Sequence, residues 1–154
     1  MKVDRAIEPL VREVFASAVA EDPEWFERAL EALADRGDAV SREALGLAAA
    51  IDSAALFLLH GGQRPDTEEL ERLASEVVQS ESWIEISTDA VSRFLRALVG
   101  DGPSMSEVLP IGDLAVVDFV VGAWLLAAFL PEDKTWTDFL DQVLVALEKE
   151  PSPR

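Results

Sequence analysis

Apolar residues recur at helical spacing along most of the chain. Ile7, Val11, Val14 and Ala18 lie on one face of a first helix, and comparable stripes continue as far as Leu147. The stripes, with the glycines and prolines that interrupt them, predict seven main helices at about 4–20, 23–35, 41–59, 66–80, 88–99, 114–130 and 135–147, plus one short turn after Ser104. We therefore predict an all-α fold, a compact bundle that forms a single domain over residues 1–150, with a frayed tail at 151–154.

Side chains suited to helix capping precede several of the predicted helices. Asp22 precedes a proline, Asp66 precedes an acidic first turn, and Thr135 stands three residues before Asp138. Residues 82–87, by contrast, have no helical spacing and are too short and isolated to form a sheet. We expect an extended connector there.

The two halves of the chain resemble each other in pattern. Residues 22–80 align with 87–146 so that Asp52 meets Asp118. Each half then contains an amphipathic helix, a glycine loop, an apolar helix with one Asp, a proline stop and a second amphipathic helix. Helices rich in Ala and Leu also align by chance. An internal repeat of two three-helix units after an N-terminal helix, and a bundle without a repeat, are therefore both open.

Composition adds a strong negative charge to this helical pattern. The 154 residues include 30 Asp and Glu, 13 Lys and Arg and no cysteine, for a formal net charge of −17. The lack of cysteine excludes disulfide scaffolds, thiolate zinc sites and cysteine nucleophiles. Because the charge repels phosphate groups, we expect no direct binding to nucleic acid and none to an anionic membrane surface.

No segment has the pattern of a targeting or membrane-spanning sequence. Charged residues occupy the stretch 1–8, where a signal peptide needs an apolar core. The apolar helix predicted at 114–130 is interrupted by Asp118 and is short for a membrane span. We expect a cytoplasmic protein.

Asp52 and Asp118 break the local pattern, because each is a carboxylate in the middle of an otherwise apolar helix. Burial of an unpaired charge is strongly unfavourable, so each should be paired, hydrogen-bonded or protonated. One interpretation makes them facing carboxylates that share a proton or a divalent cation. The other pairs each with a buried arginine, for which Arg28 and Arg93 are candidates, or turns it towards solvent.

Motifs for other chemistry are missing. His60 is the single histidine, and it lies too far along its helix from Asp52 and Ser53 for a catalytic triad. The chain has no glycine-rich phosphate loop and no metal-binding motif. We therefore predict no catalytic residue, no metal and no cofactor.

The acidic surface supplies the main functional hypothesis. Glu24, Glu27, Glu31 and Asp35 recur at i, i+3, i+7 and i+11, opposite the apolar face of the helix at 23–35. We expect this stripe to bind a basic protein partner without catalysing a reaction. An antitoxin or immunity protein, a nucleic-acid mimic and a subunit of an assembly would all act in this way.

Two alternatives stay open beside this hypothesis. A charged face is often only a solvated surface or an adaptation to salt. The chain is also compatible with a helical enzyme or small-ligand binder that uses Asp52 and Asp118, and a homo-oligomer is compatible with either function.

Overall fold

The computed structural model describes residues 1–149, and every regular element in this part of the chain is a helix. The helices are α1 (Glu8–Val19), α2 (Pro23–Ala34), α3 (Asp38–Leu59), α4 (Thr67–Ser80), α5 (Thr88–Leu98), α6 (Met105–Val108), α7 (Ile111–Ala127) and α8 (Trp136–Lys149). The predicted all-α fold is confirmed, with seven main helices and α6 as the short turn. The tail expected at 151–154 lies outside the described residues.

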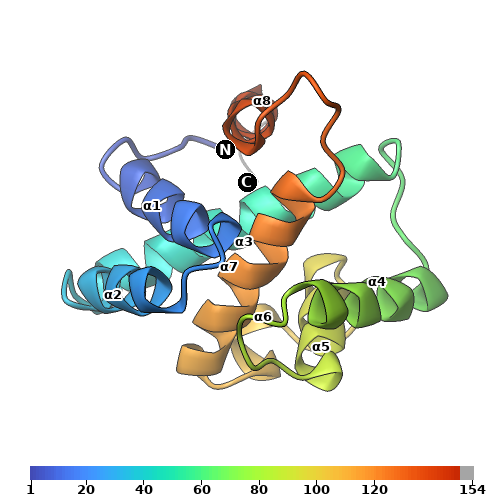
Figure 1. Ribbon diagram of the computed structural model, residues 1–154, viewed down its shortest axis with the longest axis horizontal. Coiled ribbons are helices and arrows are strands. Elements are labelled where there is room, and N and C mark those ends of the chain that lie inside the picture. The colour runs from blue at the N-terminus through green and yellow to red at the C-terminus, as the bar shows by residue number, and fades with distance from the viewer. Residues whose placement is uncertain (150–154) are drawn as a thin grey trace.

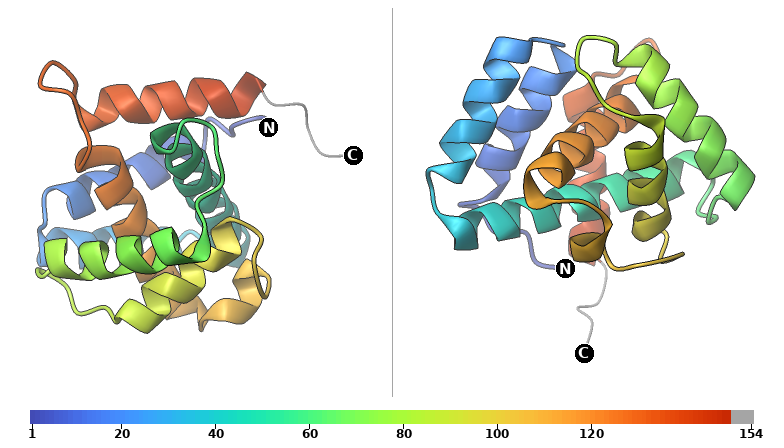
Figure 2. Two further views of the ribbon diagram at one scale, coloured as in Figure 1. Left: turned by 90° about the vertical axis from the view of Figure 1, so that its right-hand side faces the viewer. Right: turned by 90° about the horizontal axis from the view of Figure 1, so that it is seen from below.

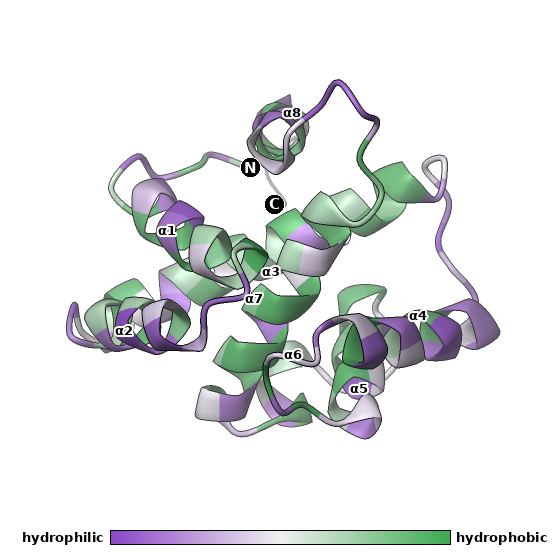
Figure 3. Cartoon of the chain, in the orientation of Figure 1, coloured by the Kyte–Doolittle hydropathy of each residue, from purple (hydrophilic) through white to green (hydrophobic). Residues whose placement is uncertain are grey.

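Helices α3 and α7 cross at the centre of the molecule and form its most extensive helix contact (Figure 1). Every residue of α7 from Val117 to Leu126 is buried. A helix that is apolar on all faces must be enclosed by other helices, and Figure 3 shows α7 coloured mainly as hydrophobic. None of the helices within residues 1–149 is both long and apolar enough to cross a membrane.

The other helices enclose this central pair. α1 packs on α7, and α2 packs on α1. α4 and α5 pack on each other, and α5 also contacts α7. α8 lies on α3 and α7 at the opposite end from α4 and α5 (Figure 2). The molecule therefore has one central crossing with a pair of helices on each of two sides and α8 across one end.

The helix caps predicted at Asp22, at Asp66 and at the Thr135–Asp138 pair are confirmed. Asp22 and Asp66 each accept a hydrogen bond from the backbone N–H three residues on, at 3.1 Å and 2.9 Å. Thr135 and Asp138 cap α8 reciprocally. The Thr135 N–H donates to the Asp138 carboxylate at 3.0 Å, and the Asp138 N–H donates to the Thr135 hydroxyl at 3.2 Å.

Three helices differ from the prediction at their ends. α1 begins at Glu8 rather than near residue 4, because residues 5–7 form a turn before it. α3 begins at Asp38, earlier than expected, because Gly37 adopts a φ of 103° that lets the chain turn directly from α2 into α3. α7 spans Ile111–Ala127, whereas the predicted range was 114–130, so both its start and its end lie earlier in the chain than predicted. After its last turn the chain bends so that Phe129 contacts Trp124 edge-on, with 4.9 Å between ring centroids.

The connector at 82–87 has no strand, as expected. Trp83 packs edge-on against Phe26 of α2, with 5.4 Å between the ring centroids. The connector between α4 and α5 therefore reaches across to α2, on the other side of the molecule's centre.

The helix contacts do not show the internal repeat. In a repeat, α4 and α8 would be the third helices of the two units and would have equivalent neighbours. The first helices of the two units would be α2 and α5. α4 packs along α5, the first helix of the other unit, but α8 has no comparable contact with α2 among the described residues and packs on α3 and α7 instead. The two halves therefore resemble each other in sequence pattern, but their last helices, α4 and α8, are not placed equivalently in the structure.

The close approach of α3 to α7 depends on Gly122. A Cβ atom at this position would overlap the Asp52 carboxylate and the ring of Phe15, and would lie 3.0 Å from Asp52 Cγ. Gly46, in the middle of α3, has open space around the corresponding position. A neighbouring element therefore blocks a side chain at the buried Gly122 but not at the exposed Gly46.

Gly122→Ala should lower the free energy of unfolding by about 1–3 kcal/mol, as overpacking does in well-filled cores. Gly46→Ala is the matched control and should raise it by up to about 1 kcal/mol, because alanine favours a helix over glycine. Urea denaturation of both variants measures these changes. Equal effects of the two substitutions would contradict the close contact between α3 and α7.

Candidate functional site

Asp52 and Asp118 meet where α3 crosses α7. Asp52 is fully buried, and only 1% of Asp118 is exposed. The Asp52 carboxyl also lies against Gly122, which is one turn after Asp118 on the same face of α7. The structure therefore brings the two carboxyl groups together on the facing sides of the central helices.

No donor from another side chain reaches this pair. When both carboxyl groups are ionised, all four oxygen atoms lack a hydrogen-bond partner among the described residues. Two ionised carboxylates are both acceptors, so a proton on one of them is needed to form a hydrogen bond between them. The pair is stable in the core only with that proton.

The electrostatics of the site favour this shared proton. Burial raises the pKa of Asp52 well above its ordinary value, and the charge of Asp118 and the hydrogen bond to it raise the pKa further. Burial also raises the pKa of Asp118, to about 7, although the hydrogen bond from Asp52 acts in the opposite direction. The two groups therefore titrate as one unit.

The interpretation that pairs each carboxylate with a buried arginine is wrong. Arg93 forms an exposed ion pair with Asp89 at 3.0 Å, and Arg28 is exposed on α2. The solvent-facing alternative is also wrong, because both carboxylates are buried. Of the arrangements considered from the sequence, the facing pair is the one that the structure contains.

A divalent cation is a poor occupant of this pair. Calcium and magnesium take about six or more oxygen ligands, and the pair supplies four oxygen atoms from two side chains. Within residues 1–149, no group of three or more His, Cys, Asp or Glu residues has an arrangement that could hold a metal ion. The chemistry open to the pair is therefore to hold or exchange a proton, or to accept hydrogen bonds from a ligand.

His60 lies apart from the carboxyl pair. Its Nδ1 is 2.8 Å from the carbonyl oxygen of Leu56, and its Nε2 is 3.4 Å from the Glu69 carboxylate on α4. Asp52 instead faces α7, so His60 and Asp52 form no catalytic triad. The histidine connects the end of α3 to α4.

The four acidic residues at helical spacing on α2 are all exposed; we name Glu24, Glu27, Glu31 and Asp35 the acidic stripe. The opposite face of α2 is buried through Phe26, Ala29 and Leu33. None of the four carboxylates forms an ion pair with another described residue. The structure therefore leaves the charge of this stripe uncompensated.

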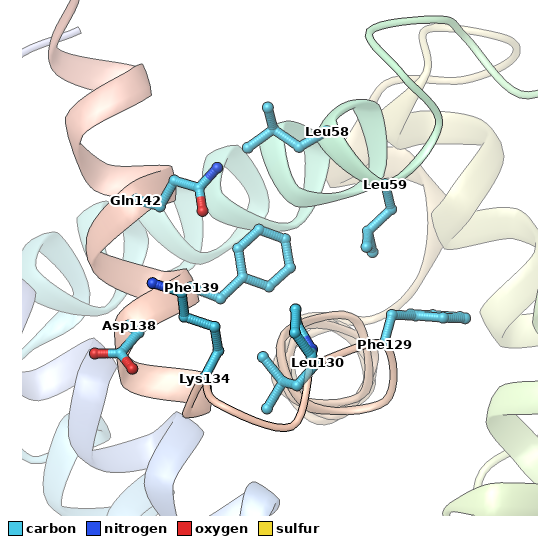
Figure 4. Close-up of a pocket in the computed structure, with 9 residues that line it drawn as sticks. Leu58, Leu59, Phe129, Leu130, Lys134, Asp138, Phe139 and Gln142 are labelled. Atoms are coloured by element: carbon cyan, nitrogen blue, oxygen red, sulfur yellow. The ribbon is translucent and has the colours of Figure 1, made fainter.

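An apolar pocket of about 280 Å³ lies where the ends of α3 and α7 meet α8 (Figure 4). Leu59, Leu130 and Phe139 surround its centre in Figure 4, and the exposed side chains of Lys134 and Asp138 lie at its edge. No buried polar group lines it. This pocket offers an apolar shape but no chemistry that selects a ligand.

A second carboxyl pair, which the sequence analysis missed, joins the turn after α1 to the end of α4. Burial raises the pKa of Glu81 to about 7, the indole N–H of Trp83 lowers it by donating at 2.5 Å, and the Glu21 carboxyl raises it. Only 7% of Glu81 is exposed. No sequence signal marks this residue, because a glutamate that follows a helix is ordinarily exposed.

The raised pKa values make the stability of the fold depend on pH. Asp118 and Glu81 each have a pKa of about 7 in the folded chain, whereas carboxyl groups in an unfolded chain titrate near pH 4. Between these two values the folded state binds more protons than the unfolded state. The free energy of unfolding should therefore fall as the pH rises through about 7.

The Asp52→Asn/Asp118→Asn double variant should be more stable than the wild type at pH 8 by roughly 2–4 kcal/mol, and the two should converge near pH 5. The reason is that two amides need no shared proton to form a hydrogen bond. Urea denaturation between pH 5 and pH 8, in enough salt to screen the surface charge, measures the difference. Glu81→Gln is the control, and it should remove only the contribution of the second pair. Identical pH profiles for the wild type and the double variant would contradict the shared proton.

No protein-family model, curated protein sequence or solved structure matches this chain. A function must therefore be argued from the geometry and charge of the residues described above.

Proposed function

We propose that this protein is a non-enzymatic interaction module that acts in the cytoplasm and presents its acidic stripe to a basic protein partner. The observation that carries the proposal is the uncompensated charge on α2. Between Glu21 and Asp38 the chain has seven acidic residues and two arginines, all exposed. No ion pair within residues 1–149 involves any of them.

Acidic residues on another helix are compensated, which sets α2 apart. On α4, Glu69 and Glu76 both pair with Arg72, the second at 2.5 Å. Glu71 of the same helix pairs with Arg96 of α5 at 3.3 Å. The local field around α4 is therefore reduced by cations of the same chain, whereas the field around α2 is available to a partner.

The geometry of α2 suits recognition of a partner. The buried face of the helix fixes it against the core, and the side-chain cap from Asp22 fixes its start. The acidic stripe consequently forms a straight row of carboxylates on a rigid element. Such a row attracts a positively charged surface over distances of about one Debye length and raises the association rate.

The chemistry of the stripe defines the class of partner. Arginine and lysine side chains on a folded protein or a basic peptide supply the charge-assisted hydrogen bonds that carboxylates accept. A toxin that the protein neutralises, a nucleic-acid-binding protein whose basic site it occupies and a basic subunit of an assembly all have this chemistry. Nucleic acid and anionic lipid do not, because their own phosphates are repelled.

Charge reversal of the acidic stripe tests the proposal. Glu27→Lys/Glu31→Lys should slow association with the partner by about tenfold or more at low salt and should weaken the salt dependence of the rate. The free energy of unfolding should change by less than about 0.5 kcal/mol, because exposed charges contribute little to folding. The partner is first captured at low salt from an extract of the source organism, and rates are then measured by stopped flow at several salt concentrations.

The matched control is Glu132→Lys/Asp133→Lys, which changes the net charge equally. Both residues are exposed in the loop between α7 and α8, well separated from α2 in Figure 1. This variant should retain the partner and nearly the full association rate. If both variants slow association equally, or if neither does, the acidic stripe is not the recognition surface.

A further inference from the structure

A groove of about 560 Å³ lies between the connector at 82–87 and the first half of α7. The start of α5 and the segment between α6 and α7 complete its walls. Its volume is within the range of about 300–1,000 Å³ that is usual for ligand sites. None of the residues of the acidic stripe lines it, so the groove is a separate surface.

The floor of this groove is apolar. Ile84, Leu109 and Val116 line it and are half-buried, because each also packs on the hydrophobic core. Ile86 is placed in the same way, and Val117 is only 2% exposed. Water in the groove therefore contacts mainly hydrocarbon, and an apolar side chain that displaces this water is stabilised.

Three carboxylates border the apolar floor, each from a different element. Glu85 belongs to the connector, Asp89 to the first turn of α5 and Asp113 to the first turn of α7, and all three are exposed. Asp89 forms an ion pair with Arg93 at 3.0 Å, whereas Glu85 and Asp113 form none with a described residue. No lysine or arginine is among the described residues that line the groove. The lining therefore leaves the negative charge at its edge without a cation.

The connector also offers backbone groups for hydrogen bonding. The N–H and C=O groups of Glu85 and Ile86, which both line the groove, form no hydrogen bond with another described residue. The next residue, Ser87, has an extended backbone with φ −94° and ψ 148°. Free backbone donors and acceptors beside an apolar groove suit an extended peptide, as in recognition by strand addition. A peptide uses these groups better than a small molecule does.

We propose that this groove binds an extended segment of a basic protein, in which one large aliphatic side chain has an arginine or lysine two positions away on each side. The aliphatic side chain displaces water from Ile84, Leu109 and Val116. Residues two positions apart lie on the same side of an extended peptide, so the flanking cations face the carboxylates at the edge. An acidic segment would meet like charge there, and so would a second copy of this chain, whose net charge is −17.

The five isoleucines of the chain report where a peptide binds. Ile84 and Ile86 line the groove. Ile7 and Ile51 are buried in the core, and Ile111 lines a different pocket. In protein labelled with ¹³C at the isoleucine methyl groups, acetyl-Arg-Ala-Leu-Ala-Arg-amide should shift the signals of Ile84 and Ile86 saturably at pH 7 and low salt. The dissociation constant should lie below about 1 mM, and the signals of Ile7 and Ile51 should stay in place.

Peptides of equal length test the two features that define the ligand. The peptide with glutamate in place of both arginines should shift neither groove signal. The peptide with glycine in place of leucine should bind at least about tenfold more weakly, because it buries no aliphatic side chain. Equal binding of the leucine and glycine peptides, or no shift of Ile84 and Ile86 by the leucine peptide, would overturn the proposal. Groove signals that move with protein concentration alone would assign the groove to a second copy of the chain and would overturn it too.

A matched pair of charge reversals tests the carboxylates at the edge. Glu85→Lys/Asp113→Lys should weaken binding of the leucine peptide at least about fivefold. Glu132→Lys/Asp133→Lys changes the net charge equally at exposed positions outside the groove, and it should weaken binding less than about twofold. Equal effects of the two variants would show that the peptide responds only to the net charge of the protein, and the proposal would be wrong.

The groove and the acidic stripe can be tested independently. Glu27→Lys/Glu31→Lys should leave binding of the leucine peptide within about twofold of wild type, whether or not it slows association with the partner of the stripe. Loss of peptide binding in this variant would place the peptide on the acidic stripe instead of the groove. The proposal for the groove would then fail, while the proposal for the stripe would stand.

Discussion

The buried contact between two carboxyl groups is the constraint on which the centre of this fold depends. Asp52 and Asp118 lie where α3 crosses α7, and neither has a cation or a backbone donor within reach. The glycine at position 122 makes room for the Asp52 carboxyl, and Phe15 of α1 closes the same space. Phe15 in turn contacts Phe119 edge-on at 5.1 Å between ring centroids, so three helices meet around the carboxyl pair.

The local features of the sequence predicted the helices well, because caps and apolar stripes act within a few residues of one another. Asp22, Asp66 and the Thr135–Asp138 pair each determine a helix start through contacts that span three positions. Errors arose where a backbone angle decides the boundary. The left-handed conformation of Gly37, for example, starts α3 earlier than its stripe of apolar residues indicates.

The candidate site could be predicted only in part. The sequence marks Asp52 and Asp118 as exceptions, but their partner depends on how two helices distant in sequence cross, and nothing local encodes that crossing. A glycine four positions after Asp118 in a nearly continuous apolar helix was the available signal, since a helical glycine often marks close approach of another element. A pocket that Asp118 lines together with Leu45 of α3 and Met105 of α6 could not be predicted from the sequence, because it requires α6 to lie over both central helices.

Stability alone does not account for the carboxyl pair. Replacement of buried ionisable pairs by apolar residues of similar volume is often neutral or stabilising, so a core built only for stability would place aliphatic side chains here. Positions that break local rules are expected at functional sites, where a structural disadvantage is offset by another role. Negative charge therefore occurs in two distinct settings in this molecule, exposed and without an ion pair on the acidic stripe of α2, and buried between two carboxyl groups where α3 crosses α7.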